Sequence, residues 1–112
     1  MDRTDDEVNY LYQPFHPAVL SLIQTIINAG KQTGTTVSMC GEMAGDPSCT
    51  RLLLGMGLRE FSMQPNAILE VKSVINKTRL DHITPMVEDI MNMEQSEQIT
   101  EASRNLNIDI TH

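Results

Sequence analysis

Residues 37–47, VSMCGEMAGDP, join a short strand to a helix and decide the fold expected for this chain. The residues before the loop are mostly β-branched, which predicts a buried strand over residues 35–39. Asp46 has the side chain of a helix N-cap, and Pro47 suits the first helical position. A strand, a glycine-containing loop and a helix therefore follow one another here, as in a parallel α/β unit.

A second unit of the same kind follows. The helix that begins at Pro47 is expected to close at Gly55 and Gly57. Residues 58–63, LREFSM, predict a second strand, although two of the six are charged. Residues 66–78 then predict an amphipathic helix. Its buried face is expected to carry Ile68, Val71 and Ile75.

Helices are also expected upstream of the first strand. A short one is predicted over residues 5–12, and a longer amphipathic one over residues 18–34, with Gly30 and Gly34 as stop signals. The apolar residues of the longer helix follow helical spacing and predict a broad buried face. They are Val19, Leu20, Leu22, Ile23, Ile26 and Ile27.

Two further helices are predicted downstream from apolar residues at helical spacing. The first is marked by Ile83, Met86, Val87 and Ile90. The second is marked by Ile99, Ala102 and Leu106. The order of elements is helix, strand, helix, strand and three helices, with no internal repeat.

Alternation of helices and strands predicts an α/β fold with a parallel sheet and right-handed connections. Such a sheet needs several strands covered on both faces, and this chain supplies two. A (β/α)8 barrel takes about 250 residues, so the chain fits the final portion of one, about two βα units, plus C-terminal helices. We therefore expect residues 1–78 to form the barrel portion and residues 79–112 a helical extension.

Composition excludes several classes of protein. The net charge is −7 and the eight basic residues are scattered, which weighs against a nucleic-acid partner. No apolar run approaches the roughly 18 residues of a membrane span. The acidic, polar N-terminus is unlike a signal peptide, so a cytoplasmic protein is expected. Two cysteines without CxxC spacing indicate neither a disulfide framework nor a zinc site.

Cys40 is the candidate for chemistry. It lies where a barrel strand would end, and in such barrels the catalytic groups lie at the carboxyl ends of strands. A thiol can give up a proton near neutral pH and take it back. Gly41 beside it would let the backbone approach a ligand closely. Read from the residues alone, Cys40 is either such a group or a structural thiol at a strand end.

The segments around this loop resemble one known family. VSMCGEMAGDP, LLLGMGLREFSM and NAILEVKSVI occur in order, and the start, MDR followed by LYQPFHPAVLSLI, fits as well. Together they resemble the C-terminal part of enzyme I, the phosphoenolpyruvate-dependent phosphotransferase of bacterial phosphotransferase systems, of the sugar or the nitrogen branch. The resemblance implies the end of a phosphoenolpyruvate-binding (β/α)8 barrel and a cytoplasmic transferase. It also implies that the chain is a fragment, inactive alone.

The resemblance also implies roles for single residues. Cys40 would donate the proton to enolpyruvate after the phosphoryl group has left for a protein histidine. Arg3 would bind the substrate phosphate, and Gly41 would shape the substrate loop. Glu42 is not expected to be catalytic because a carboxylate repels an anionic substrate. Cys49 falls outside the motif and is interpreted as structural.

Other parts of the implied machinery lie outside this chain. The resemblance implies Mg²⁺ in the parent enzyme, with ligands upstream, so no metal ligand is assigned here. None of the histidines (His16, His82, His112) stands in the motif of the phosphoryl acceptor. The implied partners are phosphoenolpyruvate, a histidine phosphocarrier protein and a second copy in a homodimer.

Two alternatives stay open at this point. Pyruvate phosphate dikinase and phosphoenolpyruvate synthase share the barrel, although their cysteine loops differ from MCGEMAGDP. The chain would otherwise be a non-enzymatic protein-interaction module. For that second reading, Met86, Met91 and Met93 would form an adaptable contact face, although methionines also fill gaps in helical cores.

Overall fold

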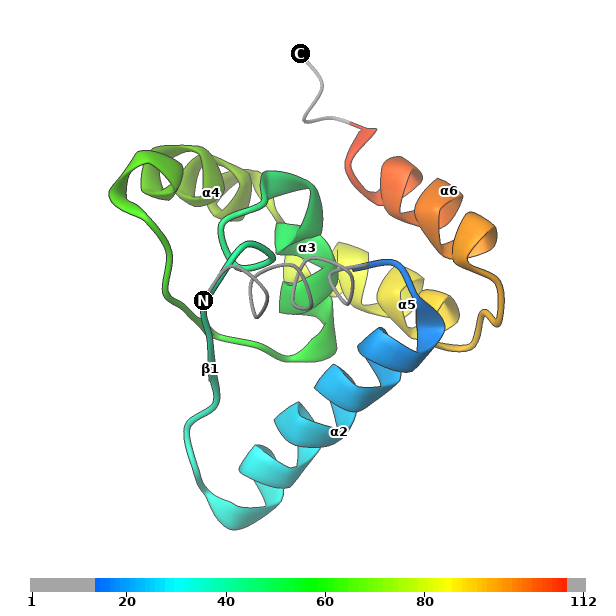
Figure 1. Cartoon of the computed structure of the whole chain (residues 1–112). Coiled ribbons are helices and arrows are strands. Elements are labelled where there is room, and N and C mark those ends of the chain that lie inside the picture. The colour runs from blue at the N-terminus through cyan, green and yellow to red at the C-terminus, as the bar shows by residue number, and fades with distance from the viewer. Residues whose placement is uncertain (1–13, 109–112) are drawn as a thin grey trace, which may run out of the picture.

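The computed structural model of the chain describes residues 14–108 (Figure 1). The elements within that range have the predicted order. They are α2 Pro17–Thr33, β1 Ser38–Met39, α3 Pro47–Met56, β2 Glu60–Phe61, α4 Pro65–Lys77, α5 Leu80–Met91 and α6 Ser96–Leu106. Arg3, the helix expected at residues 5–12 and the end of the C-terminal tail lie outside the described residues. None of the helices in the described range is long and apolar enough to cross a membrane.

β1 and β2 form a parallel pair on either side of α3 in the sequence. Ser38 lies opposite Glu60, and Met39 lies opposite Phe61. Met39 and Phe61 are half-buried and pack against the hydrophobic core, whereas Ser38 and Glu60 are exposed. Because side chains alternate between the two faces of a strand, the pair has one face on the helices and one face open. The chain is therefore a mostly helical α/β domain with a short parallel sheet.

Both strands are shorter than predicted. The expected ranges were 35–39 and 58–63, and only two residues in each are paired. The prediction that the first strand is buried was wrong, since its open face has no covering layer in the described part of the chain. A parallel sheet is usually extended by further strands and covered on both faces, and neither condition is met within residues 14–108.

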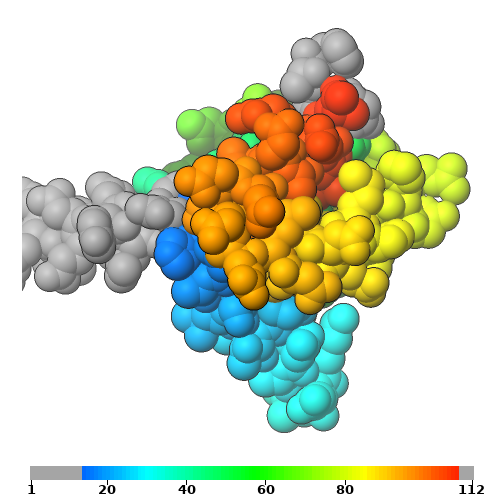
Figure 2. All heavy atoms as spheres, turned by 90° about the vertical axis from the view of Figure 1, so that its right-hand side faces the viewer, coloured from blue at the N-terminus to red at the C-terminus, as the bar shows by residue number. Residues whose placement is uncertain are grey.

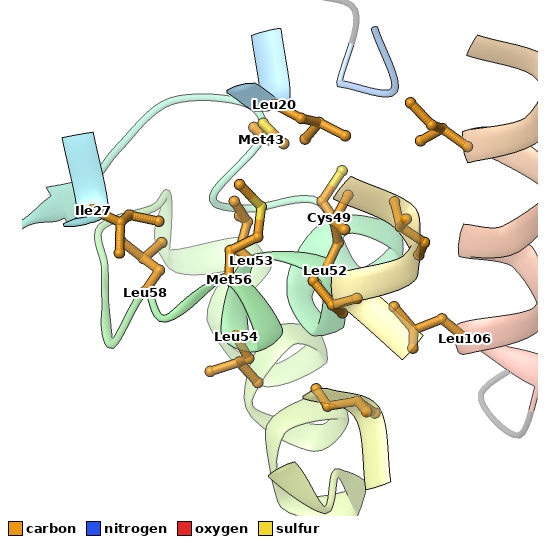
Figure 3. Close-up of a cluster of buried hydrophobic side chains, with 14 residues drawn as sticks. Leu20, Ile27, Met43, Cys49, Leu52, Leu53, Leu54, Met56, Leu58 and Leu106 are labelled. Atoms are coloured by element: carbon orange, nitrogen blue, oxygen red, sulfur yellow. The ribbon is translucent and has the colours of Figure 1, made fainter. Parts of the chain in front are cut away.

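The hydrophobic core forms around α3, which lies between the other helices in Figure 1. Cys49, Leu52 and Leu53 on this helix are fully buried (Figure 3). α4, α5 and α6 pack directly against α3, and Leu20 and Ile27 bring α2 to the same cluster. Because α3 is surrounded by other elements, it is apolar around most of its circumference, as a core helix should be.

Capping side chains mark the starts of α2 and α3, and a glycine marks the end of α3. Asp46 Oδ1 accepts hydrogen bonds from the Ser48 backbone N–H (3.0 Å) and the Ser48 hydroxyl (2.8 Å), which confirms the predicted N-cap of α3. His16 Nδ1 accepts from the Ala18 N–H at 3.1 Å and caps α2, which was not predicted. α3 ends at Gly57, whose φ of +111° is a left-handed conformation that favours glycine.

Gly30 and Gly55 were expected to stop helices, but both lie inside one. Their role is instead to let neighbouring segments approach closely. A Cβ atom at Gly55 would lie 2.4 Å from Val87 Cγ2 of α5. One at Gly30 would lie 2.3 Å from Val37 Cγ2. A side chain at either position would push the neighbouring element away from its helix.

The predicted buried faces of α2 and α4 were partly wrong. Four of the residues assigned to them are exposed: Leu22 by 62%, Ile26 by 50%, Ile68 by 45% and Ile75 by 37%. In α4, the buried residues are Val71 and Val74. The sequence predicts helices that are covered on a wide face by a sheet, and the two short strands cover only a small part of that face.

α5 and α6 lie side by side and cover one face of the molecule (Figure 2). The predicted core residues Ile83, Val87, Ile90, Ile99 and Leu106 are all buried. Met86, Met91 and Met93 are half-buried and pack against the core. Their position supports the gap-filling interpretation over a free contact face. The same core cluster contains residues from both sides of the predicted boundary at residues 78 and 79.

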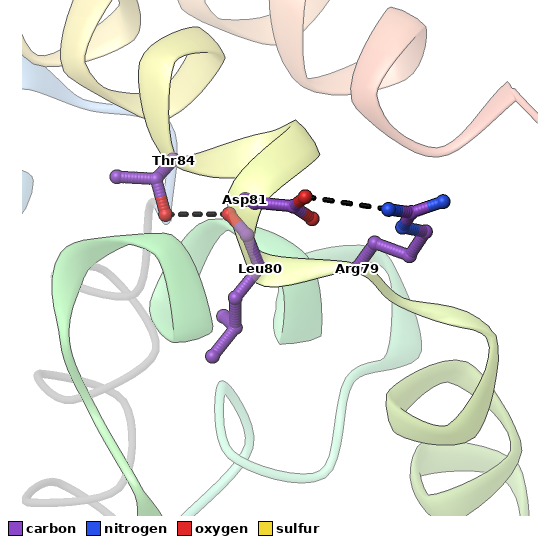
Figure 4. Close-up of polar contacts among 4 residues, drawn as sticks. All are labelled: Arg79, Leu80, Asp81 and Thr84. Carbon is purple, nitrogen blue, oxygen red and sulfur yellow. Dashed lines mark hydrogen bonds and ion pairs between the residues drawn. The ribbon is translucent and has the colours of Figure 1, made fainter.

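Figure 4 shows two side-chain contacts at the start of α5. Arg79 and Asp81 form an exposed ion pair at 3.3 Å, and the Thr84 hydroxyl donates to the Leu80 carbonyl at 2.7 Å. Pro85, inside this helix, has no N–H to donate. The first turn is therefore supported by side chains at the point where the chain leaves α4.

Candidate functional site at the ends of the parallel strands

A depression of about 770 Å³ lies where both strands end. Two loops form most of its wall. The loop after β1 supplies Cys40, Gly41 and Glu42, and the loop after β2 supplies Ser62, Met63 and Gln64. The beginnings of α3 and α4 close the remainder, with residues 45–47 and 66–67. The carboxyl ends of parallel strands are where ligands bind in α/β folds, because the loops that follow are free to carry polar groups.

Cys40 follows β1 directly and is exposed. On one side it lines the depression, and on the other it borders an apolar hollow of about 210 Å³ between α2 and β1. Gly41 then turns the chain with a φ of +93°, a conformation that strains any other residue. The turn leaves the thiol open to a small molecule in the depression, so Cys40 can act there as a proton donor or acceptor.

The two loops approach each other closely near the base of the site. A Cβ atom at Gly45 would lie 3.3 Å from the Ala67 Cβ and 3.4 Å from the Met63 Cβ. Asp46 next to it is held by its capping bonds to Ser48. The loop after β1 is thus fixed at its far end by α3 and packed against the loop after β2.

The charge of the depression does not suit an anion. Glu42 and Asp46 line it, and among the lining residues within 14–108 there is no lysine, arginine or histidine. A phosphate or carboxylate ligand would need cations from elsewhere, because it would otherwise meet two like charges. The described residues of the depression therefore include a thiol that can exchange a proton, and no cation that could bind an anion.

The same residues do not fit a divalent cation. Mg²⁺ takes oxygen ligands, usually one or two carboxylates with water and substrate phosphates. Asp46 already accepts two hydrogen bonds as a helix cap, which leaves Glu42 as the carboxylate in this depression without that constraint. Within residues 14–108, no three side chains of His, Cys, Asp or Glu gather in a way that would hold a metal ion.

The structure brings Cys40, Gly41 and Glu42 together in one depression, while Arg3 lies outside the described residues. Ser62 and Asn66, which were not predicted as site residues, line the same depression. Ser62 was expected inside the second predicted strand, residues 58–63, whereas β2 ends at Phe61 and Ser62 follows it as Cys40 follows β1. Residues at the ends of neighbouring parallel strands share an edge of the sheet.

Cys49 is structural, as interpreted. Its thiol is fully buried in the core, and burial, reinforced by the nearby charge of Asp46, raises its pKa to about 12. The folded chain therefore keeps this thiol protonated at a pH where the unfolded chain would lose the proton.

This difference predicts that the stability of the chain falls above about pH 9. The contribution of the buried, protonated Cys49 thiol to stability is fully present below the unfolded pKa of 9.0. It is lost as the pH rises toward 12. The free energy of unfolding would be measured with urea at pH 8 and at pH 10.5. Between these pH values it should fall by about 2 kcal/mol more in wild type than in Cys49→Ala, which has no thiol at this position to titrate. Equal losses in the two proteins would mean that Cys49 titrates normally in the folded state.

Comparison with known proteins places the chain in a family. Residues 1–80 match the family described as PEP-utilising enzyme, PEP-binding domain. A phosphoenolpyruvate-protein phosphotransferase of Cupriavidus necator is 46% identical over 106 residues, which are 95% of this chain and 18% of that protein. The proteins of the same name from Priestia megaterium and Bacillus subtilis are each 43% identical, over 89% and 88% of the chain.

The chain spans about a fifth of the length of these relatives, 18% in the Cupriavidus necator protein and 17% in the Bacillus subtilis protein. The family match covers both strands, the depression between their loops and α4. The relatives' matches also extend into the helices that follow, since they cover about nine tenths of the chain. The chain belongs to the family of PEP-utilising enzymes, through their PEP-binding domain.

Proposed function

We propose that this chain forms the proton-donating edge of a phosphoenolpyruvate-protein phosphotransferase. The observation that carries the proposal is the exposed thiol of Cys40 at the end of β1, on the wall of the depression. The relatives at 43–46% identity bear the name of that enzyme, which favours it over a dikinase or a synthase. The whole protein would transfer the phosphoryl group of phosphoenolpyruvate to a protein histidine and release pyruvate.

Cys40 would act after phosphoryl transfer, when the enolate of pyruvate remains in the site. The S–H bond breaks, its proton forms the third C–H bond of the methyl group, and the electron pair stays on sulfur. A donor at a strand end can be positioned over one face of the flat enolate. The proposal is supported by the exposure of Cys40 and by the left-handed conformation of Gly41 directly after it, with a φ of +93°.

The groups that bind the phosphate would come from outside the described residues. Arg3 is our proposal for one of them, because a guanidinium matches a phosphate with two parallel hydrogen bonds. We assign the Mg²⁺ of the whole enzyme to ligands beyond this chain, since the depression does not fit the ion. A histidine phosphocarrier partner, a homodimeric assembly and a cytoplasmic location are proposed for the whole protein on the family resemblance.

We also propose that the parallel pair is the end of a (β/α)8 barrel. The support is the open face of β1 and β2 together with the exposed apolar residues of α2 and α4. In a closed barrel, further strands would pair with both edges, and neighbouring helices would cover side chains such as Leu22 and Ile26. The barrel would also bring the missing phosphate-binding groups to the depression.

A chimera tests the proposed function. The chain would replace the matching residues of the Cupriavidus necator relative, and transfer of phosphate from phosphoenolpyruvate to its protein acceptor would be measured. We expect turnover within about tenfold of that relative. The isolated chain should give no heat with up to millimolar phosphoenolpyruvate and magnesium in calorimetry, because the described residues that line its depression include two carboxylates and no Lys, Arg or His, and Arg3 alone does not complete a phosphate site. A folded but inactive chimera, or clear binding by the isolated chain, would overturn the proposal.

A further inference from the structure

The register of the two strands puts a second chemical group beside Cys40. Met39 pairs with Phe61, and the Ser62 N–H donates a hydrogen bond of 2.8 Å to the Met39 carbonyl. Cys40 and Ser62 are the next residues along each chain. Neighbouring parallel strands lie about 4.8 Å apart, so the two residues start from adjacent points at the same edge.

The side chains of Cys40 and Ser62 also share a face. Met39 and Phe61 point to the helical core, and side chains alternate along a strand. The residues that follow them therefore project toward the open side, where both line the same depression. Ser62 carries the only hydroxyl among the lining residues, and its side chain has no hydrogen-bond partner within the part of the chain that the structure describes.

The charges around Cys40 create a need for such a group. Glu42 and Asp46 line the depression with it, and Glu60, exposed on β2, projects from the same open face as Ser62. Ionised carboxylates only accept hydrogen bonds, so none of these three can donate one to sulfur. A neutral hydroxyl can donate a hydrogen bond to a thiolate without adding a further charge to the site.

We propose that Ser62 is a positioning residue for Cys40, and that its hydroxyl donates a hydrogen bond to the Cys40 thiolate. This inference rests on the proposed function. When the Cys40 S–H proton passes to the methylene carbon of the enolate, the electron pair of that bond stays on sulfur, and the Ser62 O–H points at it. The thiolate then takes a proton from water, to which it is exposed, and the hydroxyl returns to its free state. Ser62 keeps its own proton throughout.

The test uses the chain alone and needs no substrate. The rate of alkylation of Cys40 by iodoacetamide would be measured at pH 7.5, with mass spectrometry to locate the label. Cys49 should stay unlabelled because it is buried and protonated. A hydrogen bond to an ionised group favours the thiolate about tenfold. The thiolate also becomes less nucleophilic, which cancels about half of this effect on a logarithmic scale, so Ser62→Ala should react about threefold more slowly.

Two variants separate this role from a structural one. Ser62→Thr keeps the hydroxyl and should restore the rate to near that of wild type. Ser38→Ala removes a hydroxyl from the same open face of β1 but outside the depression, and should leave the rate unchanged. All variants should unfold in urea at the same midpoint as wild type. Equal rates for Ser62→Ala and wild type, or an equal slowing by Ser38→Ala, would overturn the inference.

The two proposals fail in different experiments. An inactive chimera with intact Cys40 would count against the proposed function and leave the alkylation rates as measured. Unchanged alkylation of Ser62→Ala would remove Ser62 from the mechanism while an active chimera kept Cys40 in it.

Discussion

Replacing Arg51 with methionine is expected to destabilise the chain by about 3 kcal/mol. Arg51 lies on α3 and is only 4% exposed. Its guanidinium donates to the Leu106 carbonyl at 3.0 Å, to the Lys77 carbonyl at 3.3 Å and to the Thr78 hydroxyl at 2.8 Å. One side chain thus joins the central helix to the last residues of α4 and α6.

The size of the effect follows from where these acceptors lie. The last carbonyls of a helix have no partner within the helix and carry the negative end of its dipole. Arg51 satisfies such carbonyls on two helices at once, and its bond to the Leu106 carbonyl is buried while those to Lys77 and Thr78 are part-buried. Methionine keeps most of the volume but has no donor, so the Leu106 carbonyl would lose its buried partner at about 1–3 kcal/mol, and the two part-buried acceptors would add a smaller cost.

Arg59→Met is the matched control. Arg59 also donates to two backbone carbonyls, those of Leu54 at 2.9 Å and Leu58 at 2.8 Å. Unlike Arg51, Arg59 is an exposed residue. Water can replace its hydrogen bonds, so its loss should cost less than about 1 kcal/mol. Urea unfolding of both variants against wild type measures the difference. If the two substitutions cost the same, burial of the Arg51 guanidinium would not be the source of its effect.

The sequence carried enough local information to predict the order of the elements. Asp46 followed by Pro47 marked the start of α3 because both residues have a physical preference for that position. The spacing of Ile83, Val87 and Ile90 predicted the buried face of α5, since that helix packs on α3. Such signals depend on neighbours in the chain, and those neighbours are all present.

The wrong predictions of burial concern residues whose burial depends on a neighbouring element of the fold. Leu22 and Ile26 were assigned to a buried face because their spacing suits a helix on a sheet, yet little sheet covers them in this chain. The spacing of apolar residues indicates which face of a helix is suited to burial. Whether that face is buried depends on the elements that pack against it, and the described residues cover only part of the face of α2. The exposed residues are thus consistent with the family match and with the short span of the relatives that the chain covers.

The candidate site was only half predictable. Cys40 and Gly41 stand together in the sequence, so a single motif indicated both. Ser62 lies 22 positions after Cys40 and reaches the same depression only through the pairing of β1 with β2. The register of two strands is a long-range property, set by the packing of Met39 and Phe61 against the core. Neither loop alone indicates that both residues line one depression.

In the chimera with the Cupriavidus necator relative, Cys40→Ala is expected to lower turnover by about 100- to 10,000-fold. Alanine has no proton to donate, so the enolate of pyruvate would have to take one from solvent. The substitution should leave the fold intact, since Cys40 is exposed and its loss opens no cavity in the core. Binding of phosphoenolpyruvate should change little, because the thiol carries no charge that the substrate needs.

Cys49→Ala in the same chimera is the control for loss of a thiol. This residue is buried in the core, away from the depression, so the variant should keep turnover near that of the parent while unfolding at lower urea. Turnover measured by pyruvate release, together with the rate of phosphoryl transfer in a single turnover, locates the effect. A proton donor that acts after phosphoryl transfer predicts that Cys40→Ala slows pyruvate release more than phosphorylation of the acceptor. An equal slowing of both steps would show that Cys40 shapes the site for phosphoryl transfer itself.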